Sequence, residues 1–361
     1  MALNIEEKII RYLAFWRNSP VERPMVGFSL GGWFSFQSYR AIQKYRGQTT
    51  LSPDLLSPEI YFDDYDRIVA PWAEIEDDVI HSVAPIPAFP WLEAMLGIQV
   101  EVGNESVWAK EGGFDYQDVD RLDLSKDNPW RRKYLEFVAG LQDRYGDRYP
   151  VGQPILRGTS DMVAALRGSQ QMIFDLYDCP EKFQRLARTC TDFSIGLVRD
   201  QLAITRPFHD GFEVESFTLW APGGIARMQE DASALFSPDL YVKYLQGEDR
   251  RMASSFPYNV IHLHSSSLLL LDRIVEIEAI QCIQINKDQG GWGIPKMLPL
   301  FKMVQRRGKK LLIRGKLDRE DLNHLRKELS PNALYLQIVI DSPSETKQFQ
   351  DFFQPWSSIP G

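Results

Sequence analysis

The feature that most constrains the fold is an alternation of short apolar runs with capped helical segments, which begins near residue 150. Each of four apolar runs is followed by one helical period. The pairs are 260–264 with 268–277, 280–285 with 295–305, 310–314 with 319–328, and 333–340 with 344–353. A strand followed by a helix, repeated along the chain, is typical of βα units around a parallel sheet.

Further apolar runs raise the expected number of strands to about eight, the number that closes a (β/α) barrel. They lie at 25–29, 79–83 and 212–219, and at 153–157, where the helical segment 160–166 follows and makes a fifth strand–helix pair. We therefore predict a (β/α)8 TIM barrel with an N-terminal helical extension in residues 1–22, where Asn4 and Glu7 suit a capping box. No linker rich in Gly and Ser divides the chain, so residues 1–361 are expected to form a single domain. A doubly wound open sheet is the alternative, although the sequence has neither an early Gly-x-Gly-x-x-Gly motif nor a Walker A motif.

Composition narrows the class of protein. Apolar residues make up 44% of the chain and charged residues 25%, which is ordinary for a globular protein. The net charge of −8 argues against binding to nucleic acid, which requires clustered basic residues. The longest apolar cluster, 265–271, is too short to cross a bilayer, and three irregularly spaced cysteines suit a reducing compartment. These features predict a cytoplasmic protein that binds neither nucleic acid nor membrane.

The sharpest chemical signal is the pair His262 and His264, which follows the apolar run 258–261. The chain has only five histidines, so two at this spacing stand out. Residues i and i+2 of a strand point to one face, where two neutral imidazoles can bind a metal ion or an acidic substrate. The alternative, which the sequence leaves open, is a structural pair that hydrogen bonds at the mouth of the barrel.

Carboxylates at the ends of other predicted strands could complete such a site, because strand C-termini surround the active site of a barrel. Glu213, Glu215 and Asp288 are predicted to be catalytic acids or bases, and Asp341 is a further candidate metal ligand. For the two glutamates, a solvated rim of the sheet is the alternative.

Three aromatic residues and one arginine are the candidates for substrate binding. Trp33, Phe34 and Trp91 could line an apolar mouth suited to a flat or methylated ligand, although large aromatic residues are also common in cores. Arg157, at the end of a predicted strand, could bind an anionic group.

The order of several motifs resembles that of the uroporphyrinogen decarboxylase superfamily, which includes tetrapyrrole decarboxylases and zinc-dependent methylcobamide:coenzyme M methyltransferases. The resemblance extends over most of the chain from Pro24 onward. Its main segments are Arg157-Gly-Thr-Ser-Asp161, Pro180-Glu-Lys-Phe-Gln-Arg-Leu186, the stretch 231–241, the strand that ends in His262, and Gly315-Lys-Leu-Asp318. The resemblance implies a (β/α) barrel.

Departures from the motifs separate this chain from true uroporphyrinogen decarboxylases. Those enzymes carry an Arg-Gln-Ala-Gly-Arg-Tyr element that holds substrate carboxylates, whereas this chain has Ser29-Leu-Gly-Gly-Trp-Phe34. The methyltransferases bind zinc with a His-x-Cys pair and a distant cysteine. Here His262 matches the histidine, His264 replaces the first cysteine, and no cysteine follows the last predicted strand.

What the resemblance implies is metal-assisted methyl transfer, with zinc at His262 and His264 and a corrinoid as methyl donor. Iron or manganese would also suit two histidines and a carboxylate. Two alternatives remain: decarboxylation of a tetrapyrrole or other aromatic acid, and non-catalytic binding of a corrinoid or tetrapyrrole. The expected partners are a small-molecule substrate, a corrinoid protein and a second copy of the chain in a homodimer.

Overall fold

A six-stranded parallel sheet is the centre of the molecule. The computed structural model describes residues 3–31 and 38–356. Along the sheet the strands follow the order β1 (Met25–Leu30), β10 (Leu334–Ile340), β9 (Lys310–Gly315), β8 (Cys282–Lys287), β7 (Tyr258–Leu263) and β6 (Ile225–Gln229). The four strands predicted in the second half of the chain are therefore confirmed as β7 to β10. The predicted strand at 25–29 is confirmed as β1.

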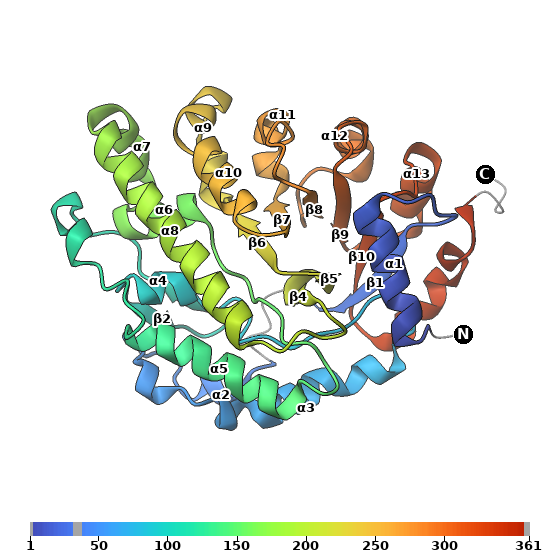
Figure 1. Cartoon of the computed structure of the whole chain (residues 1–361), viewed down its shortest axis with the longest axis horizontal. Coiled ribbons are helices and arrows are strands. Elements are labelled where there is room, and N and C mark those ends of the chain that lie inside the picture. The colour runs from blue at the N-terminus through green and yellow to red at the C-terminus, as the bar shows by residue number, and fades with distance from the viewer. Residues whose placement is uncertain (1–2, 32–37, 357–361) are drawn as a thin grey trace.

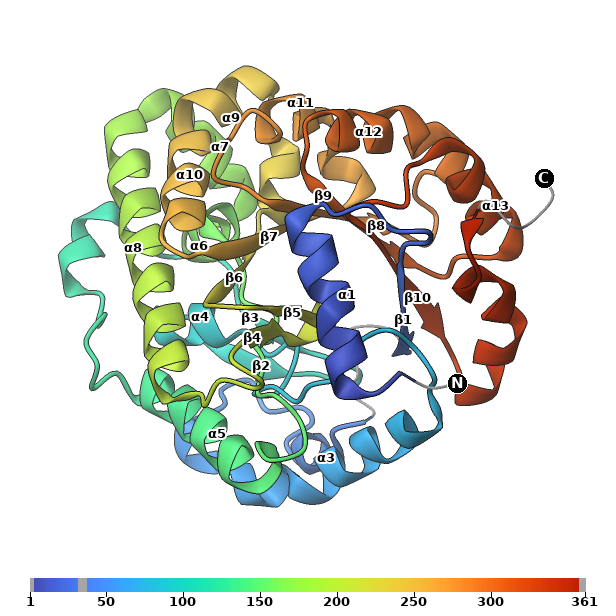
Figure 2. The same cartoon turned by 45° about the vertical axis from the view of Figure 1, so that its right-hand side comes forward.

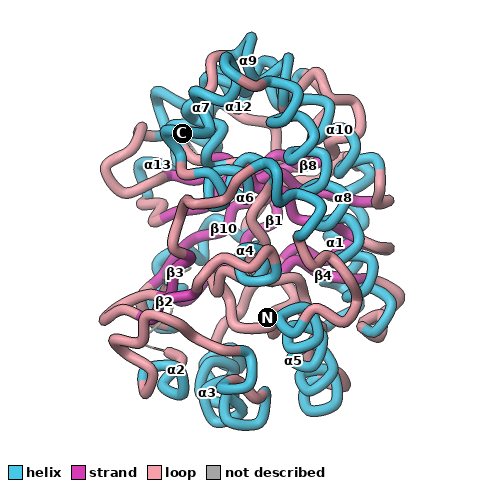
Figure 3. The backbone as a smooth tube through the Cα atoms, turned by 90° about the vertical axis from the view of Figure 1, so that its left-hand side faces the viewer, coloured by secondary structure: helices cyan, strands magenta, loops and turns pink. Residues whose placement is uncertain are grey.

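Most helices lie around the outside of the strands, whereas α1 lies across them (Figures 1, 2 and 3). Their bounds are α1 Ile5–Arg17, α2 Arg40–Gln43, α3 Phe62–Val69, α4 Trp91–Met95, α5 Pro129–Tyr145, α6 Thr159–Arg167, α7 Ser169–Asp178, α8 Pro180–Ile204, α9 Pro238–Tyr244, α10 Gln246–Ser254, α11 Leu271–Ile274, α12 Ile294–Arg306 and α13 Arg319–Glu328. The predicted helix at 344–353 is instead a 3-10 helix, Pro343–Phe353. Within the described residues, none of the helices is both long and apolar enough to cross a membrane.

The first half of the chain departs from the predicted strand pattern. Segments 79–83 and 153–157 contribute only isolated parallel bridges, Val83 to Val151 and Gln153 to Val214. The predicted strand 212–219 is wrong as a single element, because a 3-10 turn splits it into an antiparallel hairpin of β4 (Phe212–Val214) and β5 (Leu219–Ala221). Thr218, with a φ of 44°, makes the left-handed turn between them. A second hairpin, β2 (Val100–Val102) with β3 (Val107–Ala109), was not predicted.

The two faces of the sheet have different chemistry. On one face, residues such as Ala226, Ile261, Ile283 and Ile313 belong to the large hydrophobic cluster that includes the helices. On the other face, which we call the inner face, each strand carries an apolar residue of a second cluster near its N-terminal end. These residues are Met25, Ile225, Val260, Cys282, Leu312 and Tyr335.

Two residues further along each strand, the inner face becomes polar. The residues that follow are Arg227 and Gln229 on β6, His262 on β7, Gln284 and Asn286 on β8, Arg314 on β9, and Gln337 on β10. Strand register aligns His262 with Gln229 and Gln284, and aligns Arg314 with Asn286 and Gln337. Because side chains alternate along a strand, this polar layer lies toward the C-terminal ends of the strands.

The N-terminal ends of the strands are covered by α1 and the β4–β5 hairpin, as the position of α1 across the strands in Figure 2 illustrates. Helix α1 begins with the predicted capping box of Asn4 and Glu7, so that prediction is confirmed. From α1, the ring nitrogen of Trp16 donates a hydrogen bond to the carbonyl of Trp220, 2.8 Å away on β5. Tyr12, fully buried, packs in the same cluster.

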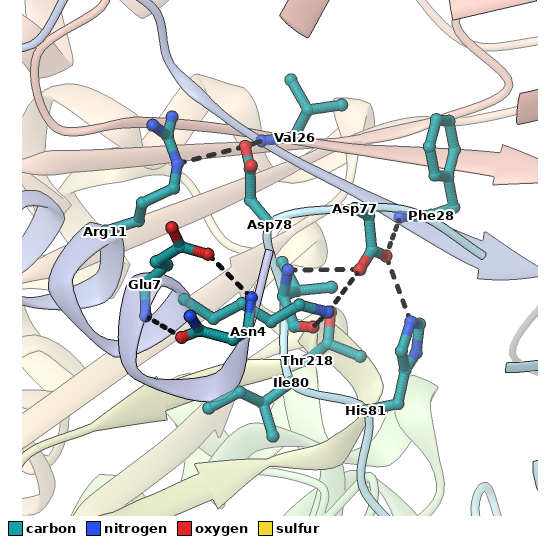
Figure 4. A network of polar contacts seen from close by, with 12 residues as sticks. Asn4, Glu7, Arg11, Val26, Phe28, Asp77, Asp78, Ile80, His81 and Thr218 are labelled. Atoms are coloured by element: carbon teal, nitrogen blue, oxygen red, sulfur yellow. Dashed lines mark hydrogen bonds and ion pairs between the residues drawn. The ribbon is translucent and has the colours of Figure 1, made fainter. Parts of the chain in front are cut away.

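Two buried aspartates tie α1 and β1 to the segment that follows α3 (Figure 4). Asp78 accepts a hydrogen bond from the backbone of Val26 at 2.9 Å, and Asp77 accepts one from the backbone of Phe28 at 3.1 Å. Lys8 of α1 pairs with Asp77 at 3.2 Å. These contacts hold the segment beside β1 although no continuous ladder joins them.

Candidate functional site

The centre of the candidate site is a cluster of Asp231, His262 and His264. Each residue offers one ligand atom, and these atoms lie within 4.8 Å of one another. The two imidazole rings are 4.5 Å apart between centroids and nearly perpendicular, at 82°. Both histidines therefore point to the same side of β7, as their i, i+2 spacing predicts.

Neighbouring side chains fix the orientation of both rings through Nδ1. The Nδ1 atom of His264 is 2.6 Å from Oδ1 of Asp288, and Nδ1 of His262 is hydrogen bonded to Oε1 of Gln284. In both rings Nε2 is then the atom that faces the cluster, and Nε2 of His264 is 3.9 Å from Oδ1 of Asp231. A hydrogen bond to the second nitrogen of a histidine is the usual way in which metal-binding imidazoles are held.

The electrostatic environment shifts the pKa values of the two histidines in opposite directions. Burial, together with the positive charge of Arg227, lowers the pKa of His262 well below its ordinary value, so that this imidazole is neutral. The hydrogen bond to Asp288 raises the pKa of His264, against the effect of burial. A neutral His262 can act as a metal ligand at neutral pH without first losing a proton.

Asp288, predicted as a catalytic residue, instead positions His264. Besides His264, it accepts hydrogen bonds from the backbone N and the hydroxyl of Ser265, both at 2.9 Å, and from Asn286 at 2.5 Å. Burial alone would raise the pKa of Asp288, but the hydrogen bonds from His264, Asn286 and Ser265 outweigh it and lower the pKa far below its ordinary value. Asp288 is therefore an ionised acceptor with its lone pairs already used.

The carboxylate of the cluster, Asp231, was missed as a site residue by sequence reasoning. It follows β6, a strand that the apolar pattern did not reveal because its middle residue is the charged Arg227. Asp341, the other carboxylate considered as a ligand, is not in the cluster. It forms an exposed ion pair with Lys316 at 2.7 Å.

Two buried arginines lie beside the cluster on the inner face. Arg227, 1% exposed, stacks on the ring of Phe217 at 5.2 Å, and its Nη1 donates to the carbonyl of Leu156 at 3.2 Å. Arg314, 4% exposed, donates from Nη2 to the hydroxyl of Ser29 at 3.3 Å. Burial lowers the pKa of Arg227 to about 10 and that of Arg314 to about 9, so both remain charged at neutral pH.

Glu215 lines a cavity of about 440 Å³ and interacts electrostatically with both arginines. Burial raises the pKa of Glu215 to about 7, even though Arg314 and Arg227 act to lower it. Ser29, Thr218 and Gln337 line the same cavity. A carboxyl group with a pKa near neutrality can both donate and accept a proton at physiological pH, as the prediction of a catalytic role requires.

Glu213 and Glu215, which the sequence places on one predicted strand, 212–219, lie on different elements. The 3-10 turn begins at Glu215, so only Glu213 remains on β4. Glu213 is 2% exposed, and burial raises its pKa well above the ordinary value. Glu213 does not line the cavity, which includes Glu215 alone of the two.

The predicted substrate-binding residues lie in three different environments. Trp91 is 1% exposed and packs against Phe89 at 4.4 Å between ring centroids, inside an aromatic core rather than on the cavity wall. Arg157 pairs with the buried Glu93 at 3.2 Å and keeps 39% of its side chain exposed. Trp33 and Phe34 lie outside the described residues.

Comparison with known proteins gives a fold but no family. No protein-family model matches the chain, and no curated protein matches its sequence significantly. A solved methyltransferase from Methanosarcina mazei matches over 93% of this chain and 94% of its own length, with a TM-score of 0.61 and 13% identity. A mannanase from Bacillus subtilis covers 95% of this chain and 88% of its own at 9% identity, with a TM-score of only 0.39. The protein thus has a methyltransferase-like fold, a mixed α/β architecture around a central parallel sheet.

Proposed function

We propose that this protein is a methyltransferase that binds a divalent metal ion, with zinc as the first candidate, through Asp231, His262 and His264. The observation that carries the proposal is the convergence of these three ligand atoms within 4.8 Å, with both imidazoles oriented through Nδ1. Two histidines and one carboxylate are a donor set found in catalytic zinc sites, which keep a further position for a substrate. The methyltransferase-like fold also supports the proposal, as far as the fold is concerned.

A metal bound here would supply Lewis acidity, lowering the pKa of a thiol or hydroxyl on the methyl acceptor. The residues of the chain then have separate tasks. Asp288 and Gln284 hold the ligand histidines in place. Glu215, at the cavity wall, receives the proton that the acceptor loses, since its pKa is near 7. The cavity binds the acceptor, and a corrinoid, carried by a partner protein, is the proposed methyl donor.

The proposal is tested by measuring metal content and methyl transfer in parallel. Wild-type protein incubated with zinc and then desalted should retain about one ion per chain, whereas His264→Ala and Asp231→Asn should retain far less. His324→Ala is the matched control, because His324 lies on α13, away from the cluster, and pairs there with Glu320 at 3.8 Å. Removal of a ligand lowers metal affinity without removing a layer of the core.

Methyl transfer is followed by the loss of the Co–C absorbance of methylcobalamin in the presence of a panel of small thiols. Zinc-loaded wild-type protein and His324→Ala should accelerate this reaction, and His264→Ala should not. Wild-type protein that binds no metal, or variants that transfer the methyl group as fast as the wild type, would contradict the proposal.

A further inference from the structure

The cavity that Glu215 lines has a second residue on its wall that can carry a proton, His81. His81 lies on the segment that follows α3 and is not a member of the metal cluster. Its ring stacks on the ring of Trp72, with 5.2 Å between the centroids and an angle of 21° between the planes. Trp72 lines the same cavity, so the stacked pair forms one part of the wall.

Asp77 determines which ring nitrogen of His81 carries a proton. Nε2 of His81 is 3.1 Å from Oδ2 of Asp77 (Figure 4). The side chain of Asp77 is fully buried, and it also accepts a hydrogen bond from the backbone of Phe28 and pairs with Lys8. Burial acts to raise the pKa of Asp77, but His81 and Lys8 outweigh it and lower that pKa. Because an ionised carboxylate only accepts hydrogen bonds, neutral His81 holds its proton on Nε2 and keeps the lone pair on Nδ1.

The other ring nitrogen, Nδ1, is open to the cavity. It has no hydrogen-bond partner among residues 3–31 and 38–356, and it is not one of the buried polar atoms that lack a partner. Nδ1 is therefore in contact with accessible space, and for His81, whose side chain is 10% exposed, that space is the cavity. A histidine that a buried carboxylate holds through one ring nitrogen, with the other nitrogen open to substrate, is the arrangement of a general base.

The rest of the wall suits a small organic molecule with an apolar part. Phe28, Ile68 and Ile155 supply apolar surface, and Thr218 and Gln337 supply hydrogen-bonding groups. The volume of about 440 Å³ is that of a small-molecule site. A hydroxyl or thiol on such a molecule can donate a hydrogen bond to the unprotonated Nδ1.

We propose that His81 is a general base of this cavity: Nδ1 removes the proton from a hydroxyl or thiol of a bound small molecule, and Asp77 positions the ring and its proton. In this step the O–H or S–H bond breaks, its electron pair stays on the oxygen or sulfur, and an Nδ1–H bond forms. The imidazolium that results is stabilised by the negative charge of Asp77, 3.1 Å from Nε2.

The inference rests on the proposed function in one respect, namely that the bound molecule is the methyl acceptor. Glu215, with a pKa of about 7, is itself protonated in a fraction of the protein molecules at neutral pH and cannot accept a proton there. His81 supplies the base in those molecules. The orientation and reactivity of Nδ1 do not require a metal ion, so they can be measured on protein without zinc.

The first test is alkylation of the full-length, EDTA-treated protein by bromoacetate at neutral pH. Peptide mapping gives the rate at each histidine, and analysis of the modified residue tells which ring nitrogen has reacted. We expect His81 to react at Nδ1 and several-fold faster than His324, although the side chain of His324 is 38% exposed and that of His81 only 10%. A histidine with a purely structural role would react according to its exposure, and therefore more slowly than His324.

Two variants separate the base from its packing. Asp77→Asn removes the charge that holds the proton on Nε2, so modification of His81 should become several-fold slower and be divided between Nδ1 and Nε2. His81→Gln, whose amide can still donate to Asp77, keeps that hydrogen bond but lacks the base. Loaded with zinc, it should bind about one ion per chain, as the wild type does, but transfer the methyl group at least about tenfold more slowly. His324→Gln is the matched control and should behave as the wild type.

Modification of wild-type His81 at Nε2, or more slowly than His324, overturns the inference. So does an unchanged ratio of the two products in folded Asp77→Asn, or methyl transfer by His81→Gln at the wild-type rate. If Asp77→Asn does not fold, the nitrogen that is modified in the wild type decides the role of Asp77.

The two proposals fail separately. A protein that takes up no zinc but is modified rapidly at Nδ1 of His81 would lose the metal and keep the base. Zinc uptake together with slow modification of His81 would do the reverse.

Discussion

Replacing Glu215 by Gln should change the way in which stability depends on pH. Burial raises the pKa of Glu215 from an ordinary value of 4.5 to about 7. The folded protein therefore holds this proton over a pH range in which the unfolded chain has released it, so wild-type stability falls as pH rises from about 4.5 to about 7. Glutamine cannot ionise, and the variant lacks this loss.

The expected size follows from the same pKa. Because each pKa unit corresponds to about 1.4 kcal/mol, moving the pKa from 4.5 to about 7 corresponds to at most about 3.5 kcal/mol. Between pH 5 and pH 8, the free energy of unfolding of Glu215→Gln should therefore rise by about 2 to 3 kcal/mol relative to that of the wild type. At both pH values, the variant also loses stability for any hydrogen bond that the amide of Gln fails to form. This loss does not depend on pH, so it leaves the expected difference between pH 5 and pH 8 unchanged.

Urea denaturation of metal-free protein, followed by fluorescence and circular dichroism, measures this difference. Glu136→Gln is the control, because it removes a half-exposed carboxylate that is paired with Lys133 on the surface of α5. Its effect should stay below about 1 kcal/mol at both pH values. A Glu215→Gln variant whose stability relative to the wild type does not change between pH 5 and pH 8 would refute the reasoning about burial.

Two other substitutions test the assigned roles of predicted site residues. Asp288→Asn should lower zinc affinity roughly ten- to hundredfold while leaving one site per chain, since Asp288 orients His264 without binding the metal. Competition with a chromophoric chelator measures this affinity. Complete loss of the site would mean that Asp288 is itself a ligand. Trp91→Ala should destabilise the protein by about 3 to 5 kcal/mol, because Trp91 is 1% exposed in the aromatic core. Trp108→Ala, at 43% exposure, should cost far less in the same urea titration, and equal effects would argue against the assignment of Trp91 to the core.

The second half of the fold could be predicted from sequence because each strand there is a mostly apolar run with a helical segment after it. In the first half the same signal was misleading, because segments 79–83 and 153–157 resemble strands in sequence but make single bridges instead of ladders. Strand β6 was missed for a different reason. Its inner face carries Arg227, a charged residue that only the folded environment of Phe217 and Leu156 makes compatible with burial.

The candidate site, too, could be predicted only in part from the sequence. His262 and His264 were found because spacing along one strand fixes their common face. Asp231 was not, because its place in the cluster depends on the register between β6 and β7, which aligns Gln229 with His262. The role of Asp288 likewise depends on a neighbouring strand end, and no property of its own sequence segment distinguishes an orienting carboxylate from a catalytic one.

The most direct test of the central claim is an anomalous difference map, recorded above the zinc edge, from crystals grown with zinc. The account predicts one strong peak within bonding distance of Nε2 of His262, Nε2 of His264 and a carboxylate oxygen of Asp231. Zinc-saturated crystals with no peak at these three residues, or with the bound ion at other side chains, would contradict it.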